Sequence, residues 1–362
     1  IVMRLVGSEM CIRDRNKSLP NQAIVWQQQQ LRLLDQRCLP ERVEFVVIQT
    51  VPAAHAAIQD MVVRGAPAIG ISAAYAVVLS AQAQAAKTWA QARQAIAQDI
   101  ELLATARPTA VNLEWALTRM QECLRQQTDI DVAVAALQRE AIAIHKQDIA
   151  ANEAMARLGA AYLDQRSRVM THCNAGALAT GGIGTALGVI RQAHSDNKID
   201  YVLANETRPW LQGARLTAWE LAQEQIAVQI VCDSAAAAAM QAHAVDWVIV
   251  GADRVVANGD VANKIGTLNL AIVARHLGKK FMVVAPLSSI DRNTSAGTQI
   301  KIEQRNSREI THLGERHLSA PDVTAWNPVF DVTPASLIDV LVTEKGVIEQ
   351  PGQAKIAALF EH

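Results

Sequence analysis

The sequence predicts an α/β protein in which a smaller, mostly helical N-terminal domain precedes a Rossmann-like domain with a parallel sheet. The first half is rich in Ala, Leu, Gln and Glu at helical spacing, whereas the second half alternates short apolar runs with helical stretches. The chain has 362 residues, which is more than one typical domain. We therefore expect the helical domain over 17–150 and the Rossmann-like domain over 151–362.

The first sixteen residues differ from the rest of the chain. They mix charged residues with short apolar pieces and follow neither a helical nor a strand period. They also lack the continuous apolar segment of a signal peptide. We interpret 1–16 as an extraneous or disordered extension that takes no part in function.

The N-terminal domain is expected to begin with short strands and to continue as helices. Residues 23–40 and 42–50 are interpreted as strands around a turn. Apolar residues then recur at spacings of three and four, which predicts helices at 53–63, 64–84, 109–126 and 131–163. Because the last of these exceeds 30 residues, we expect a break near Asp148.

The second half alternates strands with helices. Short apolar runs lie at 168–173, 200–205, 227–232, 246–252 and 280–286. Helical stretches are expected between them, at 213–225, 234–243 and 263–278. This alternation predicts right-handed βαβ units and a parallel sheet that is covered on both faces.

Polar residues follow several of the expected strands. The first run ends in Cys173 and is followed by Asn174, and Asp253 follows the fourth. In open α/β sheets, ligands bind outside the carboxyl ends of the strands, so these residues are candidates for a site. Asp233 and Ser234 are also at a strand end, but there the more common role of a helix cap is favoured.

A glycine-rich turn follows Cys173. Gly182 and Gly184 begin a dinucleotide fingerprint, but Leu187 occupies the position of its third glycine. A P-loop motif is absent from the sequence. The turn is therefore more typical of a single phosphate held at a helix N-terminus.

Composition excludes several classes of function. The net charge is −1 without a basic stretch, and aromatic residues make up 4%, which argues against nucleic-acid binding. We expect no membrane segment, because no apolar run is expected to reach the roughly 18–20 residues that are needed to span a bilayer. The five cysteines form no C-x-x-C pair, which is typical of a reduced, cytoplasmic protein without a metal site. His172 and Cys173 point to opposite faces of a strand and cannot bind one metal together.

Six blocks of sequence carry a family resemblance. They are 62–76, 106–117, 171–176, 206–221, 250–272 and 342–346. Together they resemble the methylthioribose-1-phosphate isomerases, which are aldose–ketose isomerases of methionine salvage. That family shares its fold with ribose-1,5-bisphosphate isomerases and with the alpha, beta and delta regulatory subunits of the guanine-nucleotide exchange factor of translation initiation. The resemblance extends from about residue 17 to the C-terminus and implies a homodimer.

The resemblance also implies roles for individual residues. It makes Asp253 the proton donor and Cys173 the thiol that supports the transition state. The substrate contacts that it implies are Arg64, Gly65, Ala66, Arg107, Gln212, Asn263 and Lys264. The chemistry agrees with this assignment, because Arg and Lys supply positive charge for a sugar phosphate. We expect Asn263 and Lys264 at the start of an apolar helix, where N–H donors and the helix dipole coincide.

The implied reaction converts 5-methylthioribose 1-phosphate to 5-methylthioribulose 1-phosphate. The phosphate esterifies the anomeric oxygen, so the enzyme must protonate the ring oxygen and move a hydrogen from C2 to C1. The apolar chain before Asp253 predicts a raised pKa for this acid. Cys173 is expected before a helix N-terminus, which favours a thiolate. It is either the base at C2 or a polarising group beside a direct hydride shift.

Two other functions stay open at this point, with a dehydrogenase as a third. A ribose-1,5-bisphosphate isomerase is favoured if a second group of basic residues lies at the far end of the pocket. A non-catalytic regulatory subunit is expected to lack the pair of Cys173 and Asp253, and both are present. No metal and no cofactor are expected, because the sequence offers no cluster of ligands for either.

Overall fold

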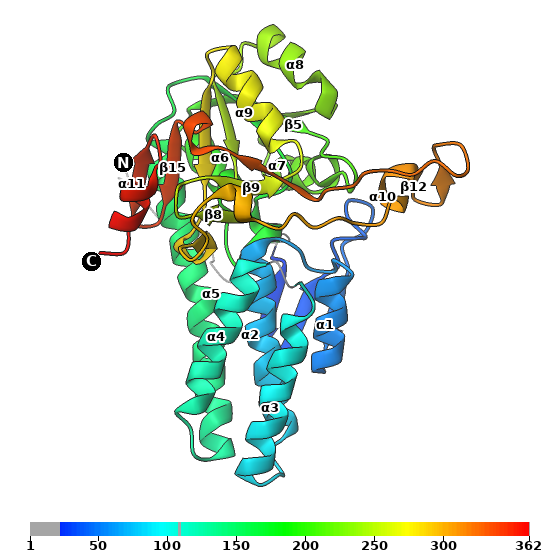
Figure 1. Cartoon of the computed structure of the whole chain (residues 1–362), viewed down its shortest axis with the longest axis vertical. Helices are drawn as coiled ribbons and strands as arrows, with labels where there is room; N and C mark the ends of the chain where they lie inside the picture. Colours follow the sequence, from blue (N-terminus) through cyan, green and yellow to red (C-terminus); the bar gives the residue numbers. More distant parts are fainter. Residues whose placement is uncertain (1–21, 108–109, 362) are drawn as a thin grey trace, which may run out of the picture.

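The computed structural model describes residues 22–107 and 110–361 (Figure 1). It confirms the predicted fold class: an N-terminal helical bundle extends below a domain with a central, mostly parallel sheet. The expected extension at 1–16 lies outside the described residues.

The N-terminal part begins with a three-stranded antiparallel sheet of β1 (Ile24–Gln27), β2 (Gln30–Leu34) and β3 (Phe45–Ile48). The helices that follow are α1 (Val51–Gln59), α2 (Ala66–Ala83), α3 (Trp89–Ala104), α4 (Val111–Arg125) and α5 (Ile130–Ala160). Helix α3 was not predicted, although its buried face has the helical spacing of Ala92, Ile96, Ile100 and Leu103.

Helix α2 is the core of the bundle and corrects one expectation. By length and composition alone, its 18 residues could span a membrane. This differs from the expectation that no apolar run in the chain is long enough for that. In this protein, 83% of the helix is buried inside the molecule, and it packs against α1, α3, α4 and α5. A helix that is apolar all round is also what the centre of a bundle requires.

Helix α5 connects the two parts of the molecule. It is continuous over 31 residues, so the expected break near Asp148 is wrong. Asp148 is buried, and its carboxylate accepts a hydrogen bond from the Gly181 N–H at 2.7 Å. Ile144 belongs to the core of the bundle, whereas Met155 packs under the sheet. The expected boundary at residue 150 falls within this helix, and the division into two domains stays a prediction.

The central sheet has the doubly wound order. Within the described residues its strands are β4 (Ser167–Thr171), β5 (Ile199–Asn205), β6 (Val228–Val231), β7 (Trp247–Val250), β10 (Lys280–Val284), β15 (Val340–Thr343) and β16 (Gly346–Glu349). Their order is β16-β15-β10-β7-β4-β5-β6, and all neighbours are parallel except β15 and β16. Leaving out β16, this is the 3-2-1-4-5-6 order of dinucleotide-binding folds, and the order reverses between β4 and β7.

Helices cover both faces of this sheet. Along β7, Val248 and Val250 face one core, and Trp247 and Ile249 face the other, as the alternation of side chains requires. Buried residues of α5, α6 (Ala186–Ser195) and α7 (Ala218–Gln223) contribute to the second core. Residues of α8 (Ala236–Ala242), α9 (Thr267–His276) and α11 (Gln353–Ala358) contribute to the first.

A second sheet of four short strands was not predicted. It has the order β11 (Ile290–Asp291), β8 (Arg254–Val256), β9 (Val261–Lys264) and β14 (Phe330–Thr333). The helix expected at 263–278 is therefore predicted wrongly over its first four residues, because α9 begins at Thr267. The hairpin between β8 and β9 contains Asn258 and Gly259, and Asn-Gly is a strong hairpin signal that was available in the sequence.

A projecting arm completes the fold. Helix α10 (Arg308–Thr311) and the hairpin of β12 (His312–Leu313) and β13 (Arg316–His317) extend away from both sheets (Figure 1).

Candidate active site

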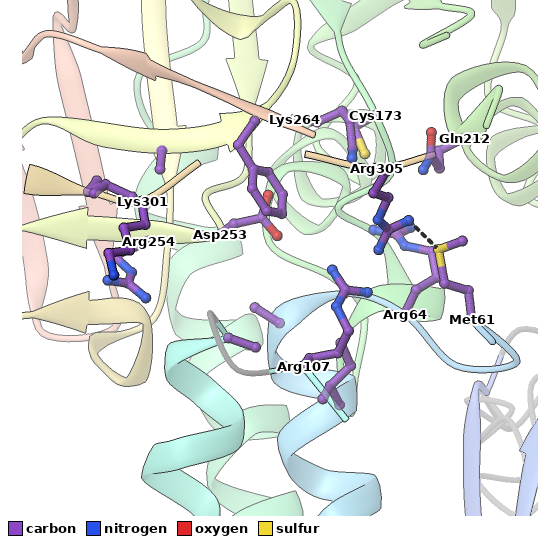
Figure 2. Close-up of a pocket in the computed structure, with 17 residues that line it drawn as sticks. Met61, Arg64, Arg107, Cys173, Gln212, Asp253, Arg254, Lys264, Lys301 and Arg305 are labelled. Carbon is purple, nitrogen blue, oxygen red and sulfur yellow. Dashed lines mark hydrogen bonds between the residues drawn. The ribbon is translucent and has the colours of Figure 1, made fainter. Parts of the chain in front are cut away.

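A pocket lies where the strands β4 and β7 end, between the central sheet and the first turn of α2. It encloses about 770 Å³, including its opening to solvent. Most of the predicted site residues line it: Arg64, Gly65, Ala66, Arg107, Cys173, Gln212, Asp253 and Lys264 (Figure 2). Asn263 lines an adjoining recess that also includes Cys173 and Asp253. The pocket thus lies at the reversal of strand order, where doubly wound folds bind their ligands.

Cys173 follows β4 in a constrained backbone conformation. Its φ is +61°, which is uncommon for a residue with a side chain. Two threonines hold it, since its N–H donates to Thr207 Oγ1 at 2.9 Å and Thr217 Oγ1 donates to its carbonyl at 2.6 Å. The expected helix N-terminus is not directly after the thiol, because α6 begins only at Ala186. A positive charge is supplied instead by Lys264, which lines the same pocket as Cys173.

The glycines of the turn after Cys173 pack the chain and do not line the pocket. The Gly181 N–H is bound to the carboxylate of Asp148 on α5. Gly184 has a φ of +92°, and a Cβ there would clash with Gly176. None of these glycines lines the pocket or its recess. Ala175, Ala179, Thr180 and Thr185 of the same stretch line the recess, so the interpretation of this turn as a phosphate site stays a prediction.

Asp253 lies between β7 and β8 and faces the pocket (Figure 2). Burial raises the pKa of its carboxyl, while the charges of Lys264, Arg64 and Arg107 oppose this shift. The predicted direction and cause of the pKa shift are confirmed. A raised pKa keeps part of the acid protonated nearer to neutral pH, as a proton donor requires.

Lys264 is the last residue of strand β9, and Asn263 precedes it in the same strand. The expectation that both residues start a helix is therefore wrong. Its Nζ donates to the carbonyl of Val329 at 3.1 Å and lies 4.9 Å from the ring centre of Phe330. Burial lowers the pKa of Lys264 to about 8, although the negative charge of Asp253 acts in the opposite direction. Asn263 is buried, and its Nδ2 donates to Thr267 Oγ1 at 3.0 Å.

Two predicted contacts have polar atoms without a protein partner. The Gln212 side chain is buried, and its Oε1 accepts no hydrogen bond from the described residues. Arg107 lies 3.5 Å from Glu303, yet its buried Nε also has no partner among them. Because buried polar atoms are normally hydrogen-bonded, one orphaned acceptor and one orphaned donor in the same pocket fit a polar ligand.

Sequence reasoning missed three basic residues of the pocket. Arg305 lies near Arg64, whereas Arg254 and Lys301 lie on the other side of Asp253 (Figure 2). Arg305 is paired with Glu303 at 2.8 Å, and Arg254 is paired with Asp291 at 3.2 Å. Lys301 and Arg305 come after the short strand β11, and no sequence motif marks them. Only Arg254 could have been found from the sequence, because it is next to Asp253.

Comparison with known proteins identifies the family. Residues 62–350 match the initiation factor 2 subunit family, and this range contains every predicted site residue. The chain belongs to this family.

Its relatives include named isomerases. The chain is 54% identical to a methylthioribose-1-phosphate isomerase of Pseudomonas aeruginosa over 93% of this chain and 95% of the relative. The crystal structure of 5-methylthioribose 1-phosphate isomerase from Pyrococcus horikoshii is 41% identical, with a TM-score of 0.88 over 95% of this chain and 96% of the other. A structure named translation initiation factor eIF-2B, subunit delta, from A. fulgidus is 37% identical, with a TM-score of 0.83 over 93% and 99% of the two chains.

Proposed function

We propose that this protein is an aldose–ketose isomerase that converts 5-methylthioribose 1-phosphate to 5-methylthioribulose 1-phosphate. The observation that supports this most is that Cys173 and Asp253, from neighbouring strand ends, face one pocket that also contains Arg64, Arg107 and Lys264. A relative that is 54% identical over nearly the whole chain has the name of this enzyme.

The basic residues suit the phosphate of such a substrate. Arg64 and Arg107 present guanidinium groups, which bind phosphate oxygens in pairs, and Lys264 adds a compact charge. Gly65 lets the backbone approach closely, because its φ of +95° is unfavourable for other residues. Gln212 and Asn263 supply amide groups for the sugar hydroxyls.

Asp253 and Cys173 suit the two parts of the reaction. Asp253 gives its proton to the ring oxygen, so that the bond between this oxygen and C1 breaks and C1 becomes electron-deficient. The hydrogen of C2 leaves as this bond breaks and moves to C1, so the two events share one transition state. It passes as a proton through the Cys173 thiolate and an enol, or directly as a hydride. In either case the O2 hydroxyl returns a proton to the Asp253 carboxylate. In both routes the second carbon becomes the ketone.

A ribose-1,5-bisphosphate isomerase is a second candidate, because Arg254 and Lys301 lie across the pocket from Arg64 and Arg107. The ion pair of Arg254 with Asp291 leaves Lys301 as the stronger candidate for a second phosphate. A purely regulatory role, suggested by the name of the A. fulgidus structure, does not require Cys173 and Asp253 to face one pocket.

One assay compares these candidates. Purified protein is given 5-methylthioribose 1-phosphate or ribose 1,5-bisphosphate, and ketose formation is followed by NMR. We expect the methylthio sugar to have the higher kcat/KM. A higher value for the bisphosphate supports the second candidate, and no ketose from either sugar contradicts both.

We also propose that the protein is a cytoplasmic homodimer. The family resemblance supports the homodimer, and the cysteines described by the structure, which are all free, suit a reducing compartment. Sedimentation equilibrium of the purified chain tests the dimer.

The lowered pKa of Lys264 predicts a pH dependence. At a pH below about 8 the amine of Lys264 is charged and attracts phosphate, and at a higher pH this charge is lost. We therefore expect kcat/KM to fall as the pH rises through about 8. Lys264→Arg should remove this basic limb, because Arg stays protonated. Lys301→Arg, at an exposed lysine of the same pocket, should retain it. A limb that persists in Lys264→Arg contradicts the assignment.

We expect turnover to need no metal ion. Within 22–107 and 110–361, no group of three or more His, Cys, Asp or Glu is arranged to hold one. Extensive dialysis against a strong chelator should therefore leave kcat unchanged. Activity that is lost on dialysis and restored by a divalent cation would sink this prediction.

A further inference from the structure

We propose that Glu220, a buried residue that does not reach the pocket, is a positioning residue that holds Arg64 in place through Asn174. This inference rests on the proposed function, since Arg64 is taken as a ligand of the substrate phosphate. Glu220 lies on α7, is fully buried and is not among the residues that line the pocket or its recess.

The first link joins Arg64 to the residue after Cys173. Arg64 Nη1 donates to Asn174 Oδ1 and Nη2 donates to the Asn174 carbonyl, both at 2.8 Å. These two bonds fix the plane of the guanidinium. They also tie the segment before α2 to the end of β4, so that a phosphate contact and the thiol share one anchor.

The second link fixes which way the amide of Asn174 points. Its Nδ2 donates to Glu220 Oε1 at 2.7 Å and to Thr217 Oγ1 at 3.3 Å. An ionised carboxylate only accepts hydrogen bonds, and a guanidinium only donates them. Glu220 on one side and Arg64 on the other therefore allow a single orientation of the amide.

The third link holds the Glu220 carboxylate. Oε1 also accepts from the Leu178 N–H at 3.3 Å, and Oε2 accepts from the Ala177 N–H at 2.8 Å and from Arg191 Nη2 at 2.8 Å. A Cβ at Gly176 would lie on this carboxylate, so the chain passes it only as glycine. Both oxygens are needed as acceptors, which the amide of Gln cannot provide.

The kinetic test replaces Glu220 by Gln. The Ala177 N–H and Arg191 can only donate, so Gln keeps its oxygen toward them and turns its NH2 to Asn174. The Asn174 amide then rotates and presents its own NH2 to Arg64. We expect KM for 5-methylthioribose 1-phosphate and the Kd of inorganic phosphate to rise about tenfold or more, because a hydrogen bond to a charged group is disturbed. We expect kcat to change less than threefold or so. Glu224→Gln is the matched control, because Glu224 also pairs with Arg191, at 2.7 Å, whereas the NH2 group of Asn174 donates to Glu220 and Thr217.

A second test measures thermal unfolding without substrate and so does not depend on the proposed function. Asn174→Asp places two carboxylates against each other, whereas the double variant Asn174→Asp with Glu220→Gln lets Gln donate to Asp. Each single variant should lower Tm, and the double variant should recover part of the loss. If Glu220→Gln does not fold alone, the double variant is still expected to fold.

Two results would overturn the proposal. In the first, the Glu220→Gln protein keeps its KM and its Kd for phosphate, and its kcat falls only in proportion to the fraction of protein that is folded. The other is a set of Tm losses that simply add in the double variant. If the wild-type protein forms no ketose, the proposed function fails, and phosphate binding together with Tm still decides the role of Glu220.

Discussion

Replacing Asp253 by Asn should lower kcat by about 10²–10⁴-fold, the usual contribution of a general acid. Asn keeps the shape of the side chain but has no proton to give to the ring oxygen. Substrate affinity should change far less, because Arg64, Arg107 and Lys264 remain. Steady-state kinetics with 5-methylthioribose 1-phosphate measures both quantities.

The same variant should also shift the pH profile. The negative charge of Asp253 raises the pKa of Lys264, so its removal should move the basic limb of kcat/KM to lower pH. Asp246→Asn is the control, because Asp246 precedes β7 at its opposite end and pairs with Arg168 at 3.1 Å. An Asp253→Asn enzyme with nearly full kcat would show that another group protonates the ring oxygen.

Replacing Cys173 by Ser should also lower kcat by about 10²-fold or more, since the hydroxyl is far too weakly acidic to ionise near neutral pH. The substitution is nearly isosteric, and it leaves the hydrogen bond from the residue 173 N–H to Thr207 and the bond from Thr217 to the residue 173 carbonyl unaffected. We therefore expect the melting temperature to stay within a few degrees and KM to change little. Thermal unfolding and steady-state kinetics of the same preparation measure these effects.

Cys123→Ser is the matched control for the thiol. Cys123 lies on α4, and burial raises the pKa of its thiol, so it should not form a thiolate near neutral pH. Its kcat should equal that of the wild type. If Cys173→Ser retained near-full kcat as well, the thiol would serve packing alone and the proton route would lose its base.

The sequence predicted the central sheet well because its signals are local. Each parallel strand is a short apolar run, and the rule that ligands bind at strand ends placed Cys173 and Asp253 together at the reversal of strand order. The unpredicted second sheet depends on distant pairing, since Lys264 on β9 lies opposite Phe330 on β14. Only its Asn258-Gly259 hairpin had a local signal.

Details of the site were also set by distant contacts. The positive φ of Cys173 is held by Thr207 and Thr217, which lie 34 and 44 residues further along the chain. No sequence period indicates such contacts. The alternation of strands and helices indicated only that a helix would begin beside the thiol. The glycines of the turn show a related limit of the sequence, because a glycine that permits close packing has the same sequence signature as one that approaches a phosphate.

The central claim is that Cys173 and Asp253 act on one bound sugar in one reaction step. It is tested most directly by kcat of the double variant Cys173→Ser with Asp253→Asn, measured beside both single variants under saturating 5-methylthioribose 1-phosphate. Groups that serve one transition state are strongly non-additive, so the double variant should be little slower than the slower single variant. A double variant whose loss equals the product of the two single losses would contradict the claim, because the residues would then act independently.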